Sequence, residues 1–137
     1  MAPDPIRPPA SPLDRFPKGA RLLKGPQFDA VFAVRLSAGD AALVVHGRPN
    51  GLGYPRLGMA VSRKVGSAVR RNRWKRLLRE AFRLSQRELP PLDLVVIPRA
   101  GAAADLDTLD RSLRQLARRV AQKAERRSPN RGQSPFP

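Results

Sequence analysis

Residues 56–83, RLGMAVSRKVGSAVRRNRWKRLLREAFR, decide the fold because a strand pattern runs directly into a helix pattern. Bulky and small side chains alternate over residues 57–62, which predicts a strand with one bulky and one small face. Gly66 breaks this pattern, and Ser67 is a suitable N-cap for a helix that continues to about Gln86. The stretch therefore predicts a strand, a tight connection and a long helix.

The predicted helix has one apolar and one basic face. At about 100° per residue, the apolar side chains fall within about 120° of arc. They are Trp74, Leu77, Leu78, Ala81 and Leu84. The opposite side, within about 100° of arc, carries Asn72, Lys75, Arg76, Arg79 and Arg83. We expect the apolar side to pack in the core and the basic side to face outward.

Shorter elements are predicted on both sides of this stretch. Pro26 suits the first turn of a helix, and Phe28, Val31 and Phe32 follow at helical spacing. Residues 42–46 alternate like a strand, and the glycine- and proline-rich residues 47–55 predict a loop. Residues 94–97 are an uninterrupted apolar run, which favours a strand that is buried on both faces.

A last helix is expected to begin at Asp105 or Asp107. Its apolar stripe is helically spaced and consists of Leu106, Leu109, Leu113, Leu116, Val120 and Ala124. The element order is therefore helix, strand, strand, helix, strand, helix. This order predicts an α+β fold, a single sandwich in which helices pack on one small sheet.

Composition divides the chain into one domain and two tails. Residues 1–17 contain a proline every few positions, which predicts a disordered arm and argues against a signal peptide. Residues 125–137 mix Arg, Ser, Pro and Gly and predict a disordered basic tail. Residues 18–124 remain as one domain, and no segment approaches the roughly 18 apolar residues that span a bilayer.

The chain is strongly basic, with 27 Lys and Arg residues against 11 Asp and Glu and a formal net charge of +16. A polyanion would relieve this charge, so nucleic acid is the first expected partner and an anionic membrane the second. Within residues 63–83, basic residues lie four apart and Glu80 is the one acid, a spacing that destabilises an isolated helix. A solvated face usually mixes signs, so this helix favours polyanion binding, and arginine forks suit folded RNA.

Few residues in the chain suit bond-breaking chemistry. The chain has no cysteine and one histidine, His46, which excludes disulfides, thiolate nucleophiles and a His/Cys zinc site. The acids are scattered, and one histidine cannot be both acid and base, so a self-sufficient nuclease is disfavoured. We expect no catalytic residue and no metal site in the chain, and the lack of cysteine fits a cytoplasmic protein.

The arginine-rich part of the quoted stretch resembles the signature of the bacterial ribonuclease P protein family. The resemblance extends from about residue 21 into the last helix, and its most specific motif is Arg71-Asn72-Arg73 followed by Lys75, Arg76 and Arg79. It implies a monomeric subunit that joins one catalytic RNA and assists that RNA in removing the 5′ leader of precursor tRNA. It also implies Mg²⁺ held mainly by the RNA, and a left-handed crossover between two parallel strands, as in the second domain of ribosomal protein S5.

The resemblance places the contact with the catalytic RNA on the long helix and the turn before it. The expected residues are Arg63, Lys64, Arg70, Arg71, Asn72, Arg73, Lys75, Arg76, Arg79 and Arg83. By its residue type alone, Asn72 could bind a base edge or a sugar hydroxyl, and it could equally cap or brace the preceding loop.

The resemblance also implies a cleft between the first helix and the sheet that holds the single-stranded leader. Phe28 and Phe32 lie one turn apart and could stack on unpaired bases, or both could be core residues. His46 stands where the family commonly has an aromatic residue, and it could stack or donate a hydrogen bond. Lys24 and Arg21 could contact leader phosphates.

Two readings from other classes use the same basic helix. One is a general architectural or ribosomal RNA-binding protein, and the other is a helix-turn-helix DNA reader. A DNA reader usually has a short helix just before its recognition helix, whereas here a predicted strand and Gly66 precede it. A membrane-surface helix is less compatible still, because the apolar side is needed for the core.

Overall fold

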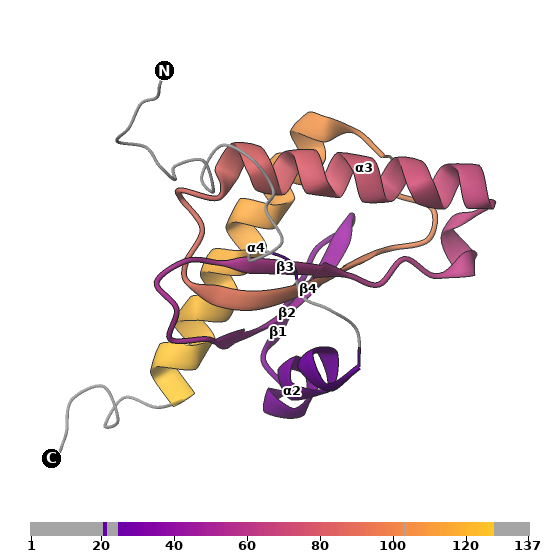
Figure 1. Cartoon of the computed structure of the whole chain (residues 1–137). Coiled ribbons are helices and arrows are strands. Elements are labelled where there is room, and N and C mark those ends of the chain that lie inside the picture. The colour runs from indigo at the N-terminus through magenta and orange to yellow at the C-terminus, as the bar shows by residue number, and fades with distance from the viewer. Residues whose placement is uncertain (1–20, 22–24, 103, 128–137) are drawn as a thin grey trace, which may run out of the picture.

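The computed structural model describes residue 21, residues 25–102 and residues 104–127. The arm predicted at residues 1–17 and most of the predicted tail lie outside the described residues. The elements, shown in Figure 1, are α2 (Pro26–Val34), β1 (Ser37–Gly39), β2 (Leu43–Pro49), β3 (Arg56–Met59), the short 3-10 helix η2 (Arg63–Val65), α3 (Ala68–Ser85), β4 (Leu92–Pro98) and α4 (Leu106–Arg127). None of the helices in this part of the chain is long and apolar enough to cross a membrane.

The four strands form one sheet in the order β1-β2-β4-β3. β2 pairs antiparallel with β4, from Leu43 opposite Pro98 to Pro49 opposite Leu92. β3 runs parallel to β4, so α3 is the crossover between two parallel neighbours. The predicted α+β sandwich is confirmed, and the predicted elements occur in the predicted order with β1 added between the first helix and β2. The left hand of the crossover stays a prediction.

Strand boundaries depart from the prediction in β1, β2 and β3, and β4 is longer at both ends than the predicted residues 94–97. The sequence does not predict β1, because Ser37, Ala38 and Gly39 lack apolar alternation; the strand forms by pairing with β2. β2 continues to Pro49, into the predicted loop, because β4 supplies partners over its whole length. β3 stops at Met59, short of the predicted residues 60–62, where Ser62 instead caps η2.

One face of the sheet is covered by α3 and α4, which also pack against each other. Leu43 and Val45 of β2 are buried on this face. Gly47 continues their row, and a Cβ atom there would approach Val120 Cγ1 of α4 to 3.0 Å. The main core therefore lies between this sheet face and the predicted apolar stripe of α4.

The opposite face of the sheet carries α2 (Figure 1), which contacts β2 and β4. Val31 of α2 and Val95 of β4 are fully buried, and Phe28, Ala60 and Ile97 pack against them. β4 thus contributes to cores on both of its faces, as its apolar run predicts. The result is a layered molecule with α2 on one side and the α3–α4 pair on the other.

The buried stripe of α3 is rotated relative to the predicted one. Trp74 and Leu78 are buried, as expected, but Leu84 is 49% exposed, so its assignment to the core is wrong. The buried side chains are Trp74, Leu78, Ala81, Phe82 and Ser85, within about 100° of arc. Because α4 packs on this stripe, Leu84 lies about 100° from its centre and faces outward.

α3 begins after the predicted cap Ser67, and of the two starts predicted for the last helix, Asp105 and Asp107, the structure selects Asp105. The Ser67 side chain accepts a hydrogen bond from the Arg70 backbone N–H at 3.3 Å. Asp105 Oδ2 accepts from the Thr108 backbone N–H at 3.0 Å. Each cap satisfies a backbone donor that the first helical turn leaves unpaired, and it fixes where the helix starts.

Candidate nucleic-acid interface

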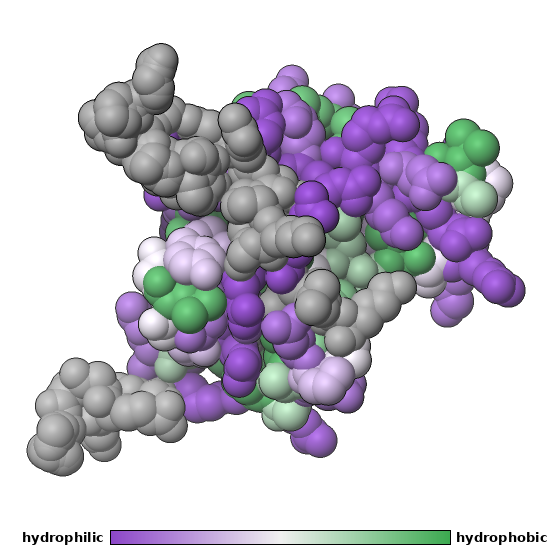
Figure 2. Space-filling view, viewed as in Figure 1, coloured by the Kyte–Doolittle hydropathy of each residue, from purple (hydrophilic) through white to green (hydrophobic). Residues whose placement is uncertain are grey.

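The outer face of α3 presents a row of cationic side chains. Asn72, Arg76 and Arg79 are exposed, and Lys75 and Arg83 are half-buried at its margins. Arg63, Lys64, Arg70 and Arg73 are exposed in and beside the same region, and Figure 2 shows hydrophilic residues gathered over α3. The predicted separation is confirmed: the indole of Trp74 faces the core, and the basic side faces outward.

Arg83 differs from the other basic residues of α3 because it is paired within the helix. Its Nη2 donates to Glu80 Oε2 at 2.6 Å, and its Nε donates to Glu80 Oε1 at 3.1 Å. The hydrogen bond from Arg83 and its charge outweigh the desolvation of Glu80, and the pKa of that carboxyl is lowered. An RNA phosphate at Arg83 would therefore compete with a carboxylate already in place.

Arg71 and Asn72 of the Arg-Asn-Arg motif have different environments. Arg71 Nε is buried and makes no hydrogen bond with any part of the chain that the structure describes. The side chain of Asn72 is exposed, and Ser67, not Asn72, supplies the cap of α3. Of the two roles open to Asn72 from its residue type, the structure leaves it free for contact with a ligand.

A hollow lies on each flank of α3. Arg70, Arg73 and Trp74 line one of about 200 Å³ with the segment before α4. The other, of about 450 Å³, lies beside β3 and reaches from Lys75 of α3 to Phe28 of α2. This second groove links the basic helix to the opposite side of the sheet, so one ligand can contact both.

Three aromatic side chains form a cluster between α2 and β2. The ring centroids of Phe32 and His46 are 4.9 Å apart, and those of Phe28 and Phe32 are 6.4 Å apart, both in edge-on arrangements. Phe28 packs against the small core, whereas Phe32 is 37% exposed. Phe28 is therefore partly a core residue, and Phe32 offers an accessible ring.

His46 has a neutral ring with an unused nitrogen. Burial lowers the pKa of its imidazole, so the uncharged form prevails at neutral pH. Its Nδ1 is buried and has no hydrogen-bond partner in the described ranges. The side chain thus combines an aromatic edge beside Phe32 with a buried polar atom that no described residue satisfies.

The two cations expected near this cluster have different outcomes. Arg21 is exposed and forms an isolated parallel bridge with Leu57, which places it alongside β3. Lys24 lies outside the described residues. The structure therefore places one of the two expected cations at the edge of the sheet.

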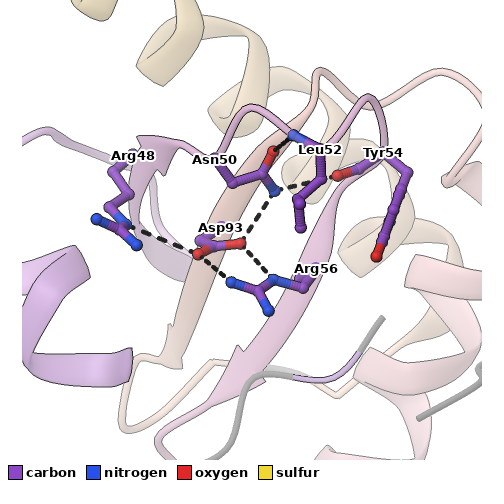
Figure 3. A network of polar contacts seen from close by, with 6 residues as sticks. All are labelled: Arg48, Asn50, Leu52, Tyr54, Arg56 and Asp93. Atoms are coloured by element: carbon purple, nitrogen blue, oxygen red, sulfur yellow. Dashed lines mark hydrogen bonds and ion pairs between the residues drawn. The ribbon is translucent and has the colours of Figure 1, made fainter. Parts of the chain in front are cut away.

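Sequence reasoning missed a buried charge network, which Figure 3 shows around Asp93 of β4. The Asp93 side chain is 1% exposed. Arg56 binds it with both ends of its fork, Nε to Oδ1 at 2.7 Å and Nη2 to Oδ2 at 2.8 Å. Asn50 Nδ2 donates to Oδ1 at 3.0 Å, and Arg48 Nε lies 3.7 Å from Oδ2. One signal was available: a carboxylate in an apolar strand needs partners.

Among the residues that the structure describes, no group of three or more His, Cys, Asp or Glu side chains is arranged to hold a metal ion. Asp93 is instead bound by arginine and asparagine side chains, and Asp40 accepts hydrogen bonds from backbone N–H groups. The described residues thus bring together exposed cations on α3 and an aromatic cluster between α2 and β2.

A family model described as Ribonuclease P matches residues 16–121, most of the chain. The chain belongs to the ribonuclease P protein family. The ribonuclease P protein component of Klebsiella pneumoniae strain 342 is 48% identical over 107 residues, which cover 76% of this chain and 89% of the relative. That of Photorhabdus laumondii is 46% identical over 106 residues, with the same coverage of both chains.

Solved structures of the ribonuclease P protein family share this fold. The Staphylococcus aureus RNase P protein has a TM-score of 0.65 at 30% identity, covering 79% of this chain and 97% of its own. The RNase P protein from Thermotoga maritima has a TM-score of 0.65 at 38% identity, covering 72% and 96%. The chain is thus a protein subunit of ribonuclease P with a role in tRNA processing, and a general architectural RNA-binding role is not favoured.

Proposed function

We propose that this ribonuclease P protein binds the catalytic RNA through the outer face of α3 and leaves bond cleavage to that RNA. The separation of faces on α3 carries the proposal, because Trp74 and Leu78 anchor the helix in the core while its cations point outward. Like charges four residues apart destabilise a helix slightly, and RNA phosphates placed between them reverse that effect.

The proposed contact residues on α3 and η2 remain those that the resemblance implies, and we expect them to contribute unequally to RNA binding. Arg70, Asn72, Arg73, Arg76 and Arg79 are exposed and bind phosphates or base edges. Arg71 has a buried Nε without a partner in the described chain, and its fork suits a bidentate phosphate contact. Arg63 and Lys64 of η2 extend the surface, and Arg83 contributes least because Glu80 binds it.

For the 5′ leader of precursor tRNA, we propose the aromatic cluster of Phe28, Phe32 and His46 as the binding cleft. An unpaired base stacked on an aromatic side chain gains about 1–3 kcal/mol, and the exposed ring of Phe32 offers such a platform. The groove from Phe28 to Lys75 continues toward α3. Arg21, beside β3, and Lys24 are proposed to contact leader phosphates.

The chain's own chemistry suits this division of labour. It holds one histidine and no cysteine, so we assign it no catalytic residue, and the Mg²⁺ ions of the reaction are proposed to be held mainly by the RNA. Cations on α3 would neutralise phosphates that otherwise require metal ions. The protein is proposed to act in the cytoplasm as one monomer per catalytic RNA.

Reconstitution tests the proposal. The purified protein is added to bacterial ribonuclease P RNA and precursor tRNA at low magnesium concentration, and leader removal is measured. We expect stimulation with both components and no cleavage by the protein alone. Cleavage by the protein alone, or RNA binding without stimulation, would contradict the proposal.

A matched pair of variants then locates the interface. Replacing Arg71, Arg73 and Arg76 by alanine should weaken binding to the catalytic RNA by about a thousandfold or more, since charge-assisted hydrogen bonds contribute about 1.5–3 kcal/mol each. Replacing the exposed Arg111, Arg118 and Arg126 of α4 removes the same charge from another surface. The second variant should bind within a few-fold of the wild type, and thermal unfolding should show that both variants fold.

A further inference from the structure

A row of charged side chains crosses the sheet next to the aromatic cluster. Arg48 of β2, Asp93 of β4 and Arg56 of β3 are register partners on three adjacent strands. Side chains two residues apart on a strand share a face, so Arg48 follows His46 by about 7 Å along β2. The intervening Gly47 faces α4, which confirms that His46 and Arg48 lie on the opposite face, the one that carries α2.

Asp93 already has three hydrogen bonds and one paired cation without Arg48. Arg56 donates two hydrogen bonds to it and Asn50 a third, at distances between 2.7 and 3.0 Å. Figure 3 shows the carboxylate between Arg56 on one side and Arg48 on the other. A buried carboxylate needs a compensating charge and hydrogen bonds, and Arg56 with Asn50 supplies both.

Arg48 is therefore a surplus cation. Its Nε lies 3.7 Å from Asp93 Oδ2, beyond hydrogen-bond length, and is buried with no hydrogen-bond partner among the described residues. The side chain is 37% exposed. Two guanidinium groups and one carboxylate leave the row with a net positive charge, and the exposed part of the Arg48 side chain is open to a ligand.

We propose that Arg48 binds a backbone phosphate of the single-stranded leader, adjacent to the nucleotide whose base meets Phe32 and His46. The inference rests on the proposed leader cleft and extends it along β2 toward the turn at residues 50–55. Asp93 holds Arg48 near the sheet by charge without occupying its donors, so the guanidinium is positioned before the RNA arrives. The ligand is a phosphodiester of extended RNA, which carries one negative charge per nucleotide.

The test uses the assembled holoenzyme and precursor tRNA with a single neutral methylphosphonate linkage, moved one position at a time along the leader. With the wild-type protein, we expect one linkage position to weaken binding by about tenfold, as loss of a charge-assisted hydrogen bond does. Arg48→Ala and Arg48→Gln should weaken binding of the all-phosphate precursor by a similar factor. When the neutral linkage stands at that position, each variant should bind the precursor as tightly as it binds the all-phosphate precursor.

Arg111→Ala is the matched control, because it removes one exposed cation of α4 and should keep the wild-type sensitivity at every position. If the Arg48 variants retain that sensitivity, or match Arg111→Ala in affinity, Arg48 does not bind a leader phosphate. If Phe32→Ala also leaves leader affinity unchanged, the leader cleft itself is wrong, and the Arg48 role fails with it. A loss in Phe32→Ala without one in Arg48→Ala overturns the Arg48 proposal alone.

Discussion

At the scale of single residues, the buried polar atoms without partners lie where RNA is proposed to bind. Among the described residues these atoms are His46 Nδ1, Arg48 Nε and Arg71 Nε. A buried polar group left unpaired costs about 1–3 kcal/mol, so a fold keeps few of them. One of the three belongs to the aromatic cluster, one lies beside it and the third lies on α3.

The carboxylates of the buried Asp93 and the half-buried Asp40 are the opposite case, because the protein itself satisfies them. Burial alone would raise the pKa of Asp93, but hydrogen bonds from Arg56 and Asn50 and the charges of Arg56 and Arg48 outweigh it. Burial would likewise raise the pKa of Asp40, but donors led by the Leu43 backbone N–H lower it. Both groups therefore have a pKa below the ordinary 3.8 in the folded protein.

This lowering predicts how the stability of the free protein depends on pH. In the unfolded chain the two carboxyls take up protons near 3.8, before they do so in the fold. Their contribution to the free energy of unfolding is thus complete above pH 3.8. It is lost as the pH falls through the lower pKa values that the two carboxyls have in the folded protein. Urea unfolding at a series of pH values measures this, and we expect the steepest decline below 3.8.

Two variants distinguish the contribution of the buried Asp93 from that of an exposed acid in that experiment. Asp93→Asn should lower the free energy of unfolding at neutral pH by about 3 kcal/mol, because it leaves the partly buried Arg56 and Arg48 without a counter-charge, and its acid decline should be shallower. Glu80→Gln breaks an ion pair that is 37% and 40% exposed, and it should cost less than about 1 kcal/mol. Equal costs for the two variants would show that burial does not set the strength of the Asp93 network.

At the scale of elements, periodicity predicted what local sequence controls. The extent of α3, its Ser67 cap, the core positions Trp74 and Leu78 and the outward basic face follow from spacing alone. The rotation of the stripe does not, because the position of α4 decides that Leu84 faces outward. β1 and the end of β2 also depend on a neighbouring strand rather than on their own residues.

The two faces of α3 can be compared directly by truncation. Trp74 is 4% exposed and should cost about 3–5 kcal/mol of unfolding free energy when replaced by alanine. Leu84 is 49% exposed, so Leu84→Ala should stay within about 0.5 kcal/mol. Chemical denaturation of both variants measures the difference. Similar losses would mean that the apolar stripe is centred where the sequence alone placed it.

At the scale of the whole molecule, the sheet separates two proposed RNA surfaces and connects them at one edge. α3 lies with α4 on one face, and the aromatic cluster and the Arg48–Asp93–Arg56 row lie on the other. The groove beside β3 joins Lys75 to Phe28 around that edge. The row itself could not be predicted from the sequence, because Arg56 and Arg48 lie 37 and 45 positions from Asp93 and meet it only through strand register.

The salt dependence of RNA binding tests this arrangement in the intact protein. Each neutralised phosphate contributes about 0.9 to the logarithmic slope for duplex nucleic acid and about 0.7 for a single strand. Replacing Arg71, Arg73 and Arg76 by alanine should therefore lower the slope for the catalytic RNA by about 2–3, whereas the α4 triple variant should barely change it. Arg48→Ala should lower the slope for binding precursor tRNA with its leader by about 0.7. It should leave the slope for binding the catalytic RNA unchanged. Equal changes in the two triple variants would mean that the net charge of +16 binds RNA diffusely and that α3 does not define an interface.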